Sequence, residues 1–580
     1  MRPIEPQKDE TLLRGNDRWL YFTQPHRVIQ AQALQEVIPA LRQIEDLVES
    51  RKWHAAGFLS YEAAPAFDNA LQTRPPTGFP LLWFGLYPPP RLVSLPQPVS
   101  PKPALGWSPT VDRQTYTEAI AQIKDHIAHG RTYQVNYTMR LRANFSADPW
   151  NFFLHLAQSQ NNHAAYIDTG RHVIASASPE LFFSLEGETI TCRPMKGTAR
   201  RGRTTLEDRE QAQWLKDSEK NRAENVMIVD MIRNDLSRIA RLGSVRVPEL
   251  FAVEKYPTLW QMTSTVTAQT SAPLTEIFEA LFPCASITGA PKVSTMKIIA
   301  ALETTPRHIY TGSIGYLAPG RKASFNVAIR TVWIDRETQT AEYGAGGGIV
   351  WDSTSADEYA EALLKTRVLT EAPPVFSLLE TMRWTPEEGF FLCEKHIARL
   401  LDSAEYFGFP APSHSALEAY LDDMASRFTS PQRIRVLLAQ NGNLSFEAQS
   451  LLPTGQHQPL RVALAKQPVH SSDVFLFHKT TQRGVYETAL QSFPGLDDVL
   501  LYNERGELTE FTLGNLLVRI GGKLYTPPVS CGLLPGTFRA HLLETGGAEE
   551  RVILREELSV CTEVFRVNSV RGIQKAIIAA

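Results

Sequence analysis

Two adjacent prolines interrupt the sequence at residues 373–374, within the stretch Thr370-Glu-Ala-Pro-Pro-Val375. This stretch follows a helix-like run from Ser355 to Leu369 and precedes a new amphipathic pattern, and proline does not continue a helix. The chain has 580 residues, which exceeds the size at which a single hydrophobic core stops growing. We therefore predict two domains, residues 1–370 and residues 371–580.

Both predicted domains mix helices with strands. Before the break, alternating segments at 164–168, 181–185 and 189–193 are typical of strands, whereas 115–129 and 205–241 have helical periodicity. After the break, 394–407 is predicted to be a helix, and 433–439, 460–465 and 515–520 are predicted to be strands. The predicted fold class is mixed α/β (α+β), with antiparallel sheets in the first domain. The proline-rich stretch 88–109 is expected to be a surface connection.

Charge and cysteine content narrow the range of functions. The formal net charge is −3, which does not favour nucleic acid or an anionic membrane as a partner. No apolar run approaches the roughly 18 residues of a spanning helix, and the first ten residues lack the apolar core of a signal peptide, so we expect a cytoplasmic protein. The five cysteines are dispersed without metal-type spacing and are expected to be reduced thiols.

One lysine stands in a setting that favours chemistry. Lys196 lies in the Pro/Gly-flanked stretch Cys192-Arg-Pro-Met-Lys-Gly-Thr-Ala-Arg-Arg-Gly202, sixteen positions after Glu180 of a Ser-Pro-Glu segment. A lysine that cannot extend into water can lose its proton and act as a nucleophile, with a nearby carboxyl group as its acid partner. An isolated Lys-Gly pair is more often a solvated turn, so companion motifs have to decide between the two interpretations.

The segment resembles the chorismate-utilising enzymes, which include anthranilate, isochorismate, salicylate and aminodeoxychorismate synthases. A Pro-x-Lys-Gly-Thr core is typical of the aminodeoxychorismate synthases, whereas anthranilate synthases carry a small residue in place of the lysine. The resemblance implies that Lys196 is the nucleophile and Glu180 the general acid. It also implies that the first domain is an antiparallel-sheet α/β sandwich that binds chorismate.

Further motifs support this resemblance. Glu224 lies in a helical stretch, at residues 219–235, on the face opposite Val226, Ile228 and Val229, and Glu358 and Glu361 share one face of a second helical stretch. Carboxylates from two helices suit Mg²⁺. The resemblance implies that Glu224 and Glu361 bind the metal directly and that Glu358 assists.

A run of three glycines, Gly346, Gly347 and Gly348, follows a strand-like segment and allows backbone N–H groups to approach an anion. By resemblance, this run cradles the ring carboxylate of chorismate. Arg330 and Lys365 would then bind carboxylates, with Tyr310 close by. Gln261 or Trp260 stands where many relatives carry a histidine near the substrate hydroxyl, so a histidine acid or base is not expected there.

The expected source of ammonia follows from a missing motif. The glutaminases of this pathway use a cysteine in a Gly-x-Cys-x-Gly turn, and none of the five cysteines of this chain has that setting. A separate glutamine amidotransferase subunit is therefore the expected partner.

From about Phe376 onward, the chain resembles the fold-type IV pyridoxal-phosphate enzymes, which include aminodeoxychorismate lyase and the branched-chain and D-amino acid aminotransferases. By resemblance, Lys479 in Phe477-His-Lys-Thr-Thr carries the cofactor, and Glu510 pairs with its pyridine nitrogen. Arg399, Thr537 and Ser569 are expected at the phosphate. The segment 374–383 retains only the end of the usual opening motif, so the first strands are expected to be short or absent.

Taken together, the two resemblances imply a bifunctional enzyme that aminates chorismate and then eliminates pyruvate to give 4-aminobenzoate for folate biosynthesis. One alternative keeps the first activity and makes the second domain a D- or branched-chain amino acid aminotransferase. Another makes the second domain a non-catalytic scaffold. A third makes the first domain an anthranilate or salicylate synthase, which Lys196 argues against.

Overall fold

The computed structural model describes residues 4–15, 18–159, 162–370, 374–451 and 458–579. The chain forms two compact units. The first unit contains residues 1–199 and 214–373, and the second contains residues 200–213 and 374–580. The sequence places the domain boundary at 370/371, next to residues 371–373, which lie outside the described residues. The assignment of residues 200–213 to the second unit was not anticipated.

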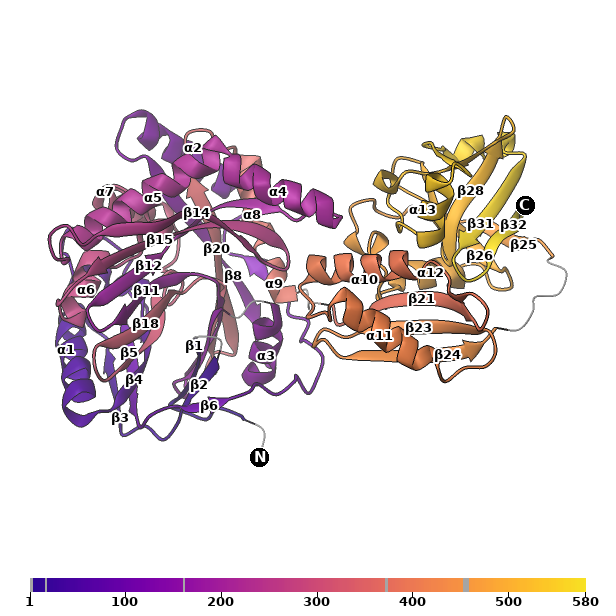
Figure 1. Ribbon diagram of the computed structural model, residues 1–580. Coiled ribbons are helices and arrows are strands. Elements are labelled where there is room, and N and C mark those ends of the chain that lie inside the picture. Colours follow the sequence, from indigo (N-terminus) through magenta and orange to yellow (C-terminus); the bar gives the residue numbers. More distant parts are fainter. Residues whose placement is uncertain (1–3, 16–17, 160–161, 371–373, 452–457, 580) are drawn as a thin grey trace. The chain divides into compact units, whose positions relative to one another are not determined.

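Two large antiparallel sheets form the centre of the first unit (Figure 1). The strands of the first sheet run in the order β16 (Gly289–Ala290), β8 (Gln134–Asn144), β20 (Thr340–Ile349), β19 (Thr331–Asp335), β10 (His172–Ser178), β9 (His163–Asp168), β1 (Glu10–Gly15), β2 (Arg18–Phe22) and β6 (Arg91–Val93), with β7 (Ser108–Pro109) beside β8. Those of the second run in the order β13 (Met195–Arg200), β15 (Leu259–Gln269), β12 (Thr189–Arg193), β11 (Leu181–Glu186), β18 (Lys322–Val327), β17 (Ser313–Ala318), β4 (His54–Leu59), β5 (Leu82–Tyr87) and β3 (Arg27–Ala31), with β14 (Arg246–Lys255) beside β15.

Helices cover the outer face of each sheet, which gives four layers. A core between the sheets joins residues such as Phe22 and Phe58. On the second sheet pack α1 (Leu34–Arg51), α5 (Glu219–Ser237) and α6 (Leu274–Leu281). On the first sheet pack α2 (Arg113–Ala128), α3 (Pro149–Ser159), α7 (Lys292–Leu302), α8 (Ser355–Leu364) and α9 (Arg367–Thr370). The predicted antiparallel sandwich is therefore confirmed.

Capping side chains set two boundaries that bear on the site. The predicted helical run 205–241 is broken into α4 (Thr205–Asp217) and α5, because the side chain of Ser218 accepts a hydrogen bond from the Asn221 backbone and starts a new helix. Thr354 caps α8 in the same way through the Asp357 backbone N–H. Val226 of α5 is 37% exposed and Asn225 is buried, so the buried stripe is shifted from the predicted one.

The second unit contains two sheets. A four-stranded antiparallel sheet has the order β22 (Gly389–Phe390), β21 (Leu378–Thr385), β23 (Gln432–Leu438) and β24 (Leu444–Ser450). A mixed sheet has the order β27 (Leu508–Phe511), β26 (Asp498–Tyr502), β25 (Leu460–Leu464), β32 (Gly572–Ile578), β31 (Glu563–Asn568), β28 (Gly514–Ile520), β29 (Lys523–Thr526) and β30 (Glu549–Glu550). Pairing of β27 with β28 closes six of these strands into a ring.

The helices of this unit are α10 (Cys393–Phe407), α11 (His414–Ala425), α12 (Gly484–Gln491) and α13 (Thr537–Glu544). The first strands were expected to be short or absent. This is wrong for β21, which has eight residues and pairs with β23 over most of its length, whereas β22 has only two residues. Alternate residues of β21, such as Leu378 and Met382, are buried against α10 and α11, and this apolar face fixes the strand although the usual opening motif is incomplete.

Candidate active sites

Lys196 lies on the edge strand β13. Its side chain is partly accessible to solvent, and loss of hydration lowers the pKa of its ammonium group despite the opposing carboxylates of Glu224 and Glu361. The backbone beside it is held at two points. Asn225 donates from Nδ2 to the Lys196 carbonyl (3.2 Å), and Gln261 donates from Nε2 to the Gly197 carbonyl (2.8 Å). The backbone of Lys196 is therefore held in place and the pKa of its side chain is lowered, as a nucleophilic amine requires.

Glu180, between β10 and β11, is 3% exposed. Burial raises the pKa of its carboxyl group to about 7, against the lowering effects of a hydrogen bond from Ser286 and of the charge on Lys196. The Ser286 hydroxyl donates to Glu180 Oε1 over 2.7 Å. A carboxyl group whose pKa is raised to about 7, within electrostatic reach of a lysine of lowered pKa, can act as a general acid.

Carboxylates from α5 and α8 interact with this lysine. A Cβ atom on Gly347 would lie 3.0 Å from Glu358 Oε2 and 3.9 Å from Glu361 Oε1, so the absence of a side chain in β20 leaves room in front of both groups. Burial, then the neighbouring Glu361, raises the pKa of Glu358. Glu224 is the carboxylate with the largest electrostatic effect on Lys196. Carboxylate oxygens on adjacent turns of α8 are the ligand type that suits a hard divalent cation such as Mg²⁺. Among the described residues, however, Glu224, Glu358 and Glu361 do not form a set whose ligand atoms all lie within 4.8 Å of one another.

The next glycine reveals a residue that the sequence analysis missed. A Cβ atom on Gly348 would lie 2.5 Å from Gln134 Nε2 and 2.7 Å from Lys196 Nζ. Gln134 is fully buried in β8, and neither amide atom has a hydrogen-bond partner among the described residues. A buried amide without partners is costly unless a ligand completes it. Gln134 precedes the glycine run by more than 200 residues and belongs to none of the motifs in the sequence, so only strand pairing reveals it.

The residues predicted to bind the substrate carboxylates, Arg330 and Lys365, differ in their surroundings, as does the neighbouring Tyr310. Arg330 adopts φ +51°, which is unusual for arginine, and loss of hydration lowers the pKa of its guanidinium group. Lys365 is engaged with the protein itself, through Glu361 (2.8 Å) and the Gly346 carbonyl (2.8 Å). Tyr310 packs its ring against β20, where a Cβ atom on Gly344 would lie 2.2 Å from it. Of the two cations, Lys365 is therefore already paired within the protein.

In the second unit, Lys479 follows a short turn and its carbonyl accepts a hydrogen bond from the Leu379 backbone of β21 (2.9 Å). Burial, then the charge of Arg399, lowers the pKa of Lys479 to about 8. Glu510 is 3% exposed, and burial raises the pKa of its carboxyl group to about 7. Tyr486 donates to Glu510 Oε1 (2.8 Å), and Asn515 donates to Oε2 (3.2 Å). The predicted lysine and acid are thus within electrostatic reach of each other.

Arg399 of α10 forms two hydrogen bonds with Glu380 of β21, at 2.8 and 2.7 Å. His396 contacts the same carboxylate through Nδ1 (2.7 Å) and Thr537 through Nε2 (3.2 Å). These contacts hold the pKa of Glu380 at about 2, because Arg399 and His396 offset its burial. Glu380 was not predicted as a functional residue, although it lies within the retained end of the opening motif.

The residues present fit pyridoxal phosphate. They include an amine of lowered proton affinity for its aldehyde, a buried carboxyl for its pyridine nitrogen, and an arginine with Thr537 at the start of α13 for its phosphate. The turn before Thr537 is tight, since a Cβ atom on Gly536 would lie 1.9 Å from Asn515 Oδ1. Ser569 donates to the Thr381 carbonyl of β21 at 3.4 Å.

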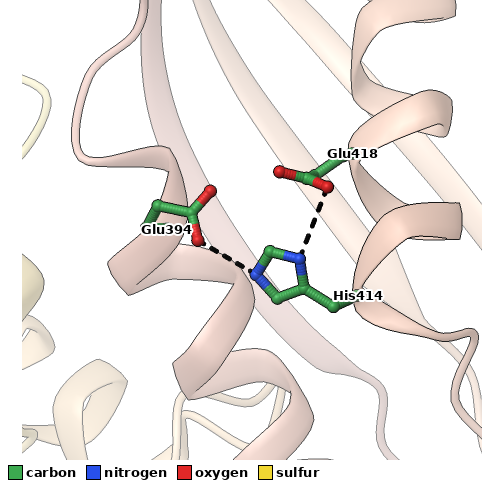
Figure 2. Close-up of side chains that lie close together, drawn as sticks. All are labelled: Glu394, His414 and Glu418. Carbon is green, nitrogen blue, oxygen red and sulfur yellow. Dashed lines mark ion pairs between the residues drawn. The ribbon is translucent and has the colours of Figure 1, made fainter.

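One further group of ionisable side chains connects α10 and α11 at the surface (Figure 2). His414 lies between Glu394 (3.1 Å) and Glu418 (3.5 Å), one at each ring nitrogen. All three side chains are well exposed, so this cluster has the character of a solvated ion pair. It shares no residue with either predicted site.

Comparisons with known protein families divide the chain at the same place. Residues 92–371 match the chorismate binding enzyme family, and residues 377–576 match the amino-transferase class IV family. Among the described residues, no helix is long and apolar enough to cross a membrane.

Two curated relatives each cover less than half of the chain. Aminodeoxychorismate synthase component 1 of Salmonella typhimurium is 43% identical over 264 residues, which is 45% of this chain and 58% of the relative. The protein of the same name from Escherichia coli is 41% identical over 274 residues, or 46% of this chain and 59% of the relative. The chain thus spans somewhat more than half the length of these relatives. The crystal structure of anthranilate synthase component I from Streptococcus pneumoniae shares the fold (TM-score 0.52, 24% identity, 63% of this chain and 91% of that one).

Proposed function

We propose that this chain, which joins a chorismate binding enzyme region to an amino-transferase class IV region, makes 4-aminobenzoate from chorismate in two steps. The first step replaces the ring hydroxyl of chorismate with an amino group. The second removes the enolpyruvyl side chain as pyruvate and leaves an aromatic ring.

In the first step, Lys196 Nζ adds to a ring carbon, the ring double bonds shift, and the hydroxyl leaves as water with a proton from Glu180. Ammonia then adds to the ring and displaces Nζ, which gives 4-amino-4-deoxychorismate. The lowered pKa of Lys196 and the pKa of Glu180 at about 7 supply the neutral amine and the protonated acid that this step needs.

Substrate binding in this step requires several cationic contacts, because chorismate carries two carboxylates. Glu224, Glu361 and Glu358 would hold Mg²⁺, which when bound neutralises negative charge on the substrate. Arg330 would receive a carboxylate, and the backbone of Gly346, Gly347 and Gly348 would lie against the ring carboxylate, with Tyr310 beside it. Lys365 would orient Glu361, to which it is already bonded.

In the second step, Lys479 removes the proton from the amine-bearing ring carbon, and pyruvate leaves as the ring becomes aromatic. Pyridoxal phosphate, when bound, supplies the electron sink for this proton removal. Glu510 would keep the pyridine nitrogen protonated, and Arg399, Thr537 and Ser569 would hold the phosphate.

The observation that carries the proposal is the placement of Lys196. A lysine of lowered pKa interacts with Glu224, Glu361 and Glu180 and faces Gly348. By resemblance, this lysine separates aminodeoxychorismate synthases from anthranilate synthases. The name component 1 of the relatives supports a second subunit that supplies ammonia, and we propose a glutamine amidotransferase for that role.

The product of the purified protein tests this proposal. With chorismate, Mg²⁺, ammonium and pyridoxal phosphate, we expect 4-aminobenzoate and one pyruvate per chorismate, without any requirement for 2-oxoglutarate. Anthranilate as the chromatographically identified product would reject the first step. A 2-oxoglutarate-dependent amino transfer without pyruvate release from 4-amino-4-deoxychorismate would reject the second.

A further inference from the structure

Residues 200–213 lie in the first half of the sequence but belong to the second compact unit. This segment, here called the strap, begins with a closed loop. Arg201 pairs with Asp208 at 2.7 and 2.8 Å, and the Gly202 N–H donates to the same carboxylate at 2.9 Å. Asp208 is 2% exposed, and a Cβ atom on Gly202 would lie 2.1 Å from the Asp208 nitrogen. The loop is therefore tight and internally satisfied.

The strap is attached to the end of α10. The Tyr406 hydroxyl donates to the Gly202 carbonyl at 2.6 Å, and Arg201 donates to the Tyr406 carbonyl at 2.8 Å with its guanidinium 4.5 Å from the Tyr406 ring centre. Burial raises the pKa of Tyr406 to about 12, so its hydroxyl remains a donor. Thr205 donates to the Asp402 carbonyl at 3.2 Å. All these contacts lie within one unit, and the hydrogen bond from Tyr406 to Gly202 is buried.

The same strap holds the residue that precedes Lys479. His478 is 3% exposed, and its ring lies 4.3 Å from the ring of Tyr406, centre to centre. Its Nε2 lies 3.2 Å from the Arg203 carbonyl, and its Nδ1 lies 3.0 Å from the Ser403 hydroxyl. Because a carbonyl only accepts, Nε2 carries a proton and donates to Arg203. The strap therefore holds the Nε2 side of the His478 ring through Arg203, and α10 holds the Nδ1 side through Ser403.

We propose that the strap is a positioning element of the second site, which holds His478 and through it sets the backbone of Lys479. Beyond His478, the Lys479 carbonyl is fixed by the Leu379 N–H of β21 (2.9 Å), and Thr480 forms a bridge with Leu378. Lys479 is thus held on one side by a hydrogen bond to β21 and on the other by the hydrogen bond of His478 to the strap. The inference rests on the proposed function in one respect, that Lys479 is the residue that carries pyridoxal phosphate.

The test uses full-length protein and two variants that loosen the strap without touching the cofactor site. Tyr406→Phe keeps the ring and removes the hydroxyl that holds Gly202, whereas Asp208→Asn breaks the loop itself. Arg427→Gln is the matched control, because Arg427 forms an exposed ion pair with Asp423 in the same unit. For each protein we would measure the dissociation constant of pyridoxal phosphate, the pH midpoint of the visible absorbance of the bound cofactor, and the melting temperature.

Since Tyr406→Phe removes the hydrogen bond to Gly202 and Asp208→Asn removes the charge that pairs with Arg201, we expect about tenfold weaker cofactor binding and a displaced pH midpoint in both strap variants. Arg427→Gln should match the wild type. Unchanged affinity and midpoint in Tyr406→Phe and Asp208→Asn would overturn the inference, as would a lower melting temperature as their only effect. If Asp208→Asn does not fold, Tyr406→Phe decides alone. A wild-type protein that develops no cofactor absorbance would instead reject the proposed function of the second unit.

Discussion

At the scale of single residues, the first step depends on the pKa values of Glu180 and Lys196, one raised and the other lowered. Glu180 must be protonated and Lys196 neutral, and burial moves both pKa values in the required direction. With free ammonia held constant, we expect the amination rate to fall as pH rises above about 7, because Glu180 loses its proton. The fall should approach about tenfold per pH unit well above that value.

The hydrogen bond from Ser286 to Glu180 provides a test of the direction in which the pH profile shifts. Its hydrogen bond lowers the pKa of Glu180, so Ser286→Ala should move the alkaline limb of the profile to higher pH. Ser286→Thr, which keeps a hydroxyl, should restore the wild-type limb. An unchanged limb in Ser286→Ala, or an alkaline limb that persists in Glu180→Gln, would show that another group supplies the proton.

At the scale of elements, we expect alanine to be tolerated less well in the glycine run of β20 than at a glycine outside the site. Gly348→Ala should reduce the amination rate by at least about a hundredfold, because its methyl group would occupy the space next to Lys196 Nζ and Gln134 and displace the reacting groups. Pyruvate release from supplied 4-amino-4-deoxychorismate should not change. Gly106→Ala is the control, since a Cβ atom there meets nothing within 4 Å. Equal amination by both variants would contradict the assigned role.

A buried ion network links β8 to the segment after α7. Glu303 is 3% exposed and pairs with Arg140 (2.7 Å) and Arg307 (2.6 Å), each 1% exposed. We expect Glu303→Leu to destabilise the first unit by about 3–5 kcal/mol, because two guanidinium groups are left buried and unpaired. Glu188→Gln, which breaks an exposed pair with Arg241, should cost less than about 1 kcal/mol. Denaturant unfolding monitored by fluorescence would measure both, and similar losses in the two variants would argue against the network.

Local sequence predicts elements of this fold better than it predicts the partners of each residue. The strands near 181–185 and 189–193 and the helix near 394–407 were predicted within two residues at their boundaries, because their apolar periodicity is regular. The break at Ser218 was missed, since a helix cap is a hydrogen bond that periodicity does not register. Gln134, Asn225, Ser286 and Glu380 were missed as site residues because only strand pairing and packing bring them to the sites.

At the scale of the whole molecule, the two sites should respond to different reagents. Removal of divalent cations should stop amination of chorismate and spare pyruvate release from supplied 4-amino-4-deoxychorismate. Removal of pyridoxal phosphate should do the reverse. Readdition of Mg²⁺ or of the cofactor should restore the matching activity only. Loss of both activities on removal of either component would contradict two separate sites.

The sequence placed the main division of the chain at its double proline, and the two matched families divide there as well. It did not predict that residues 200–213 belong to the second unit. That assignment depends on contacts such as the one between Tyr406 and Gly202, which join residues more than 200 positions apart. Long-range packing of this kind has no local pattern in the sequence.

The most direct measurement of the central claim, that two lysines act in succession, is a time course with chorismate, Mg²⁺, ammonium and pyridoxal phosphate. It would compare the wild type with Lys196→Ala, Lys479→Ala and the exposed control Lys297→Ala. We predict that Lys196→Ala forms neither the amino intermediate nor 4-aminobenzoate. Lys479→Ala should accumulate 4-amino-4-deoxychorismate, and Lys297→Ala should match the wild type. Formation of 4-aminobenzoate by Lys196→Ala at the wild-type rate would contradict the account.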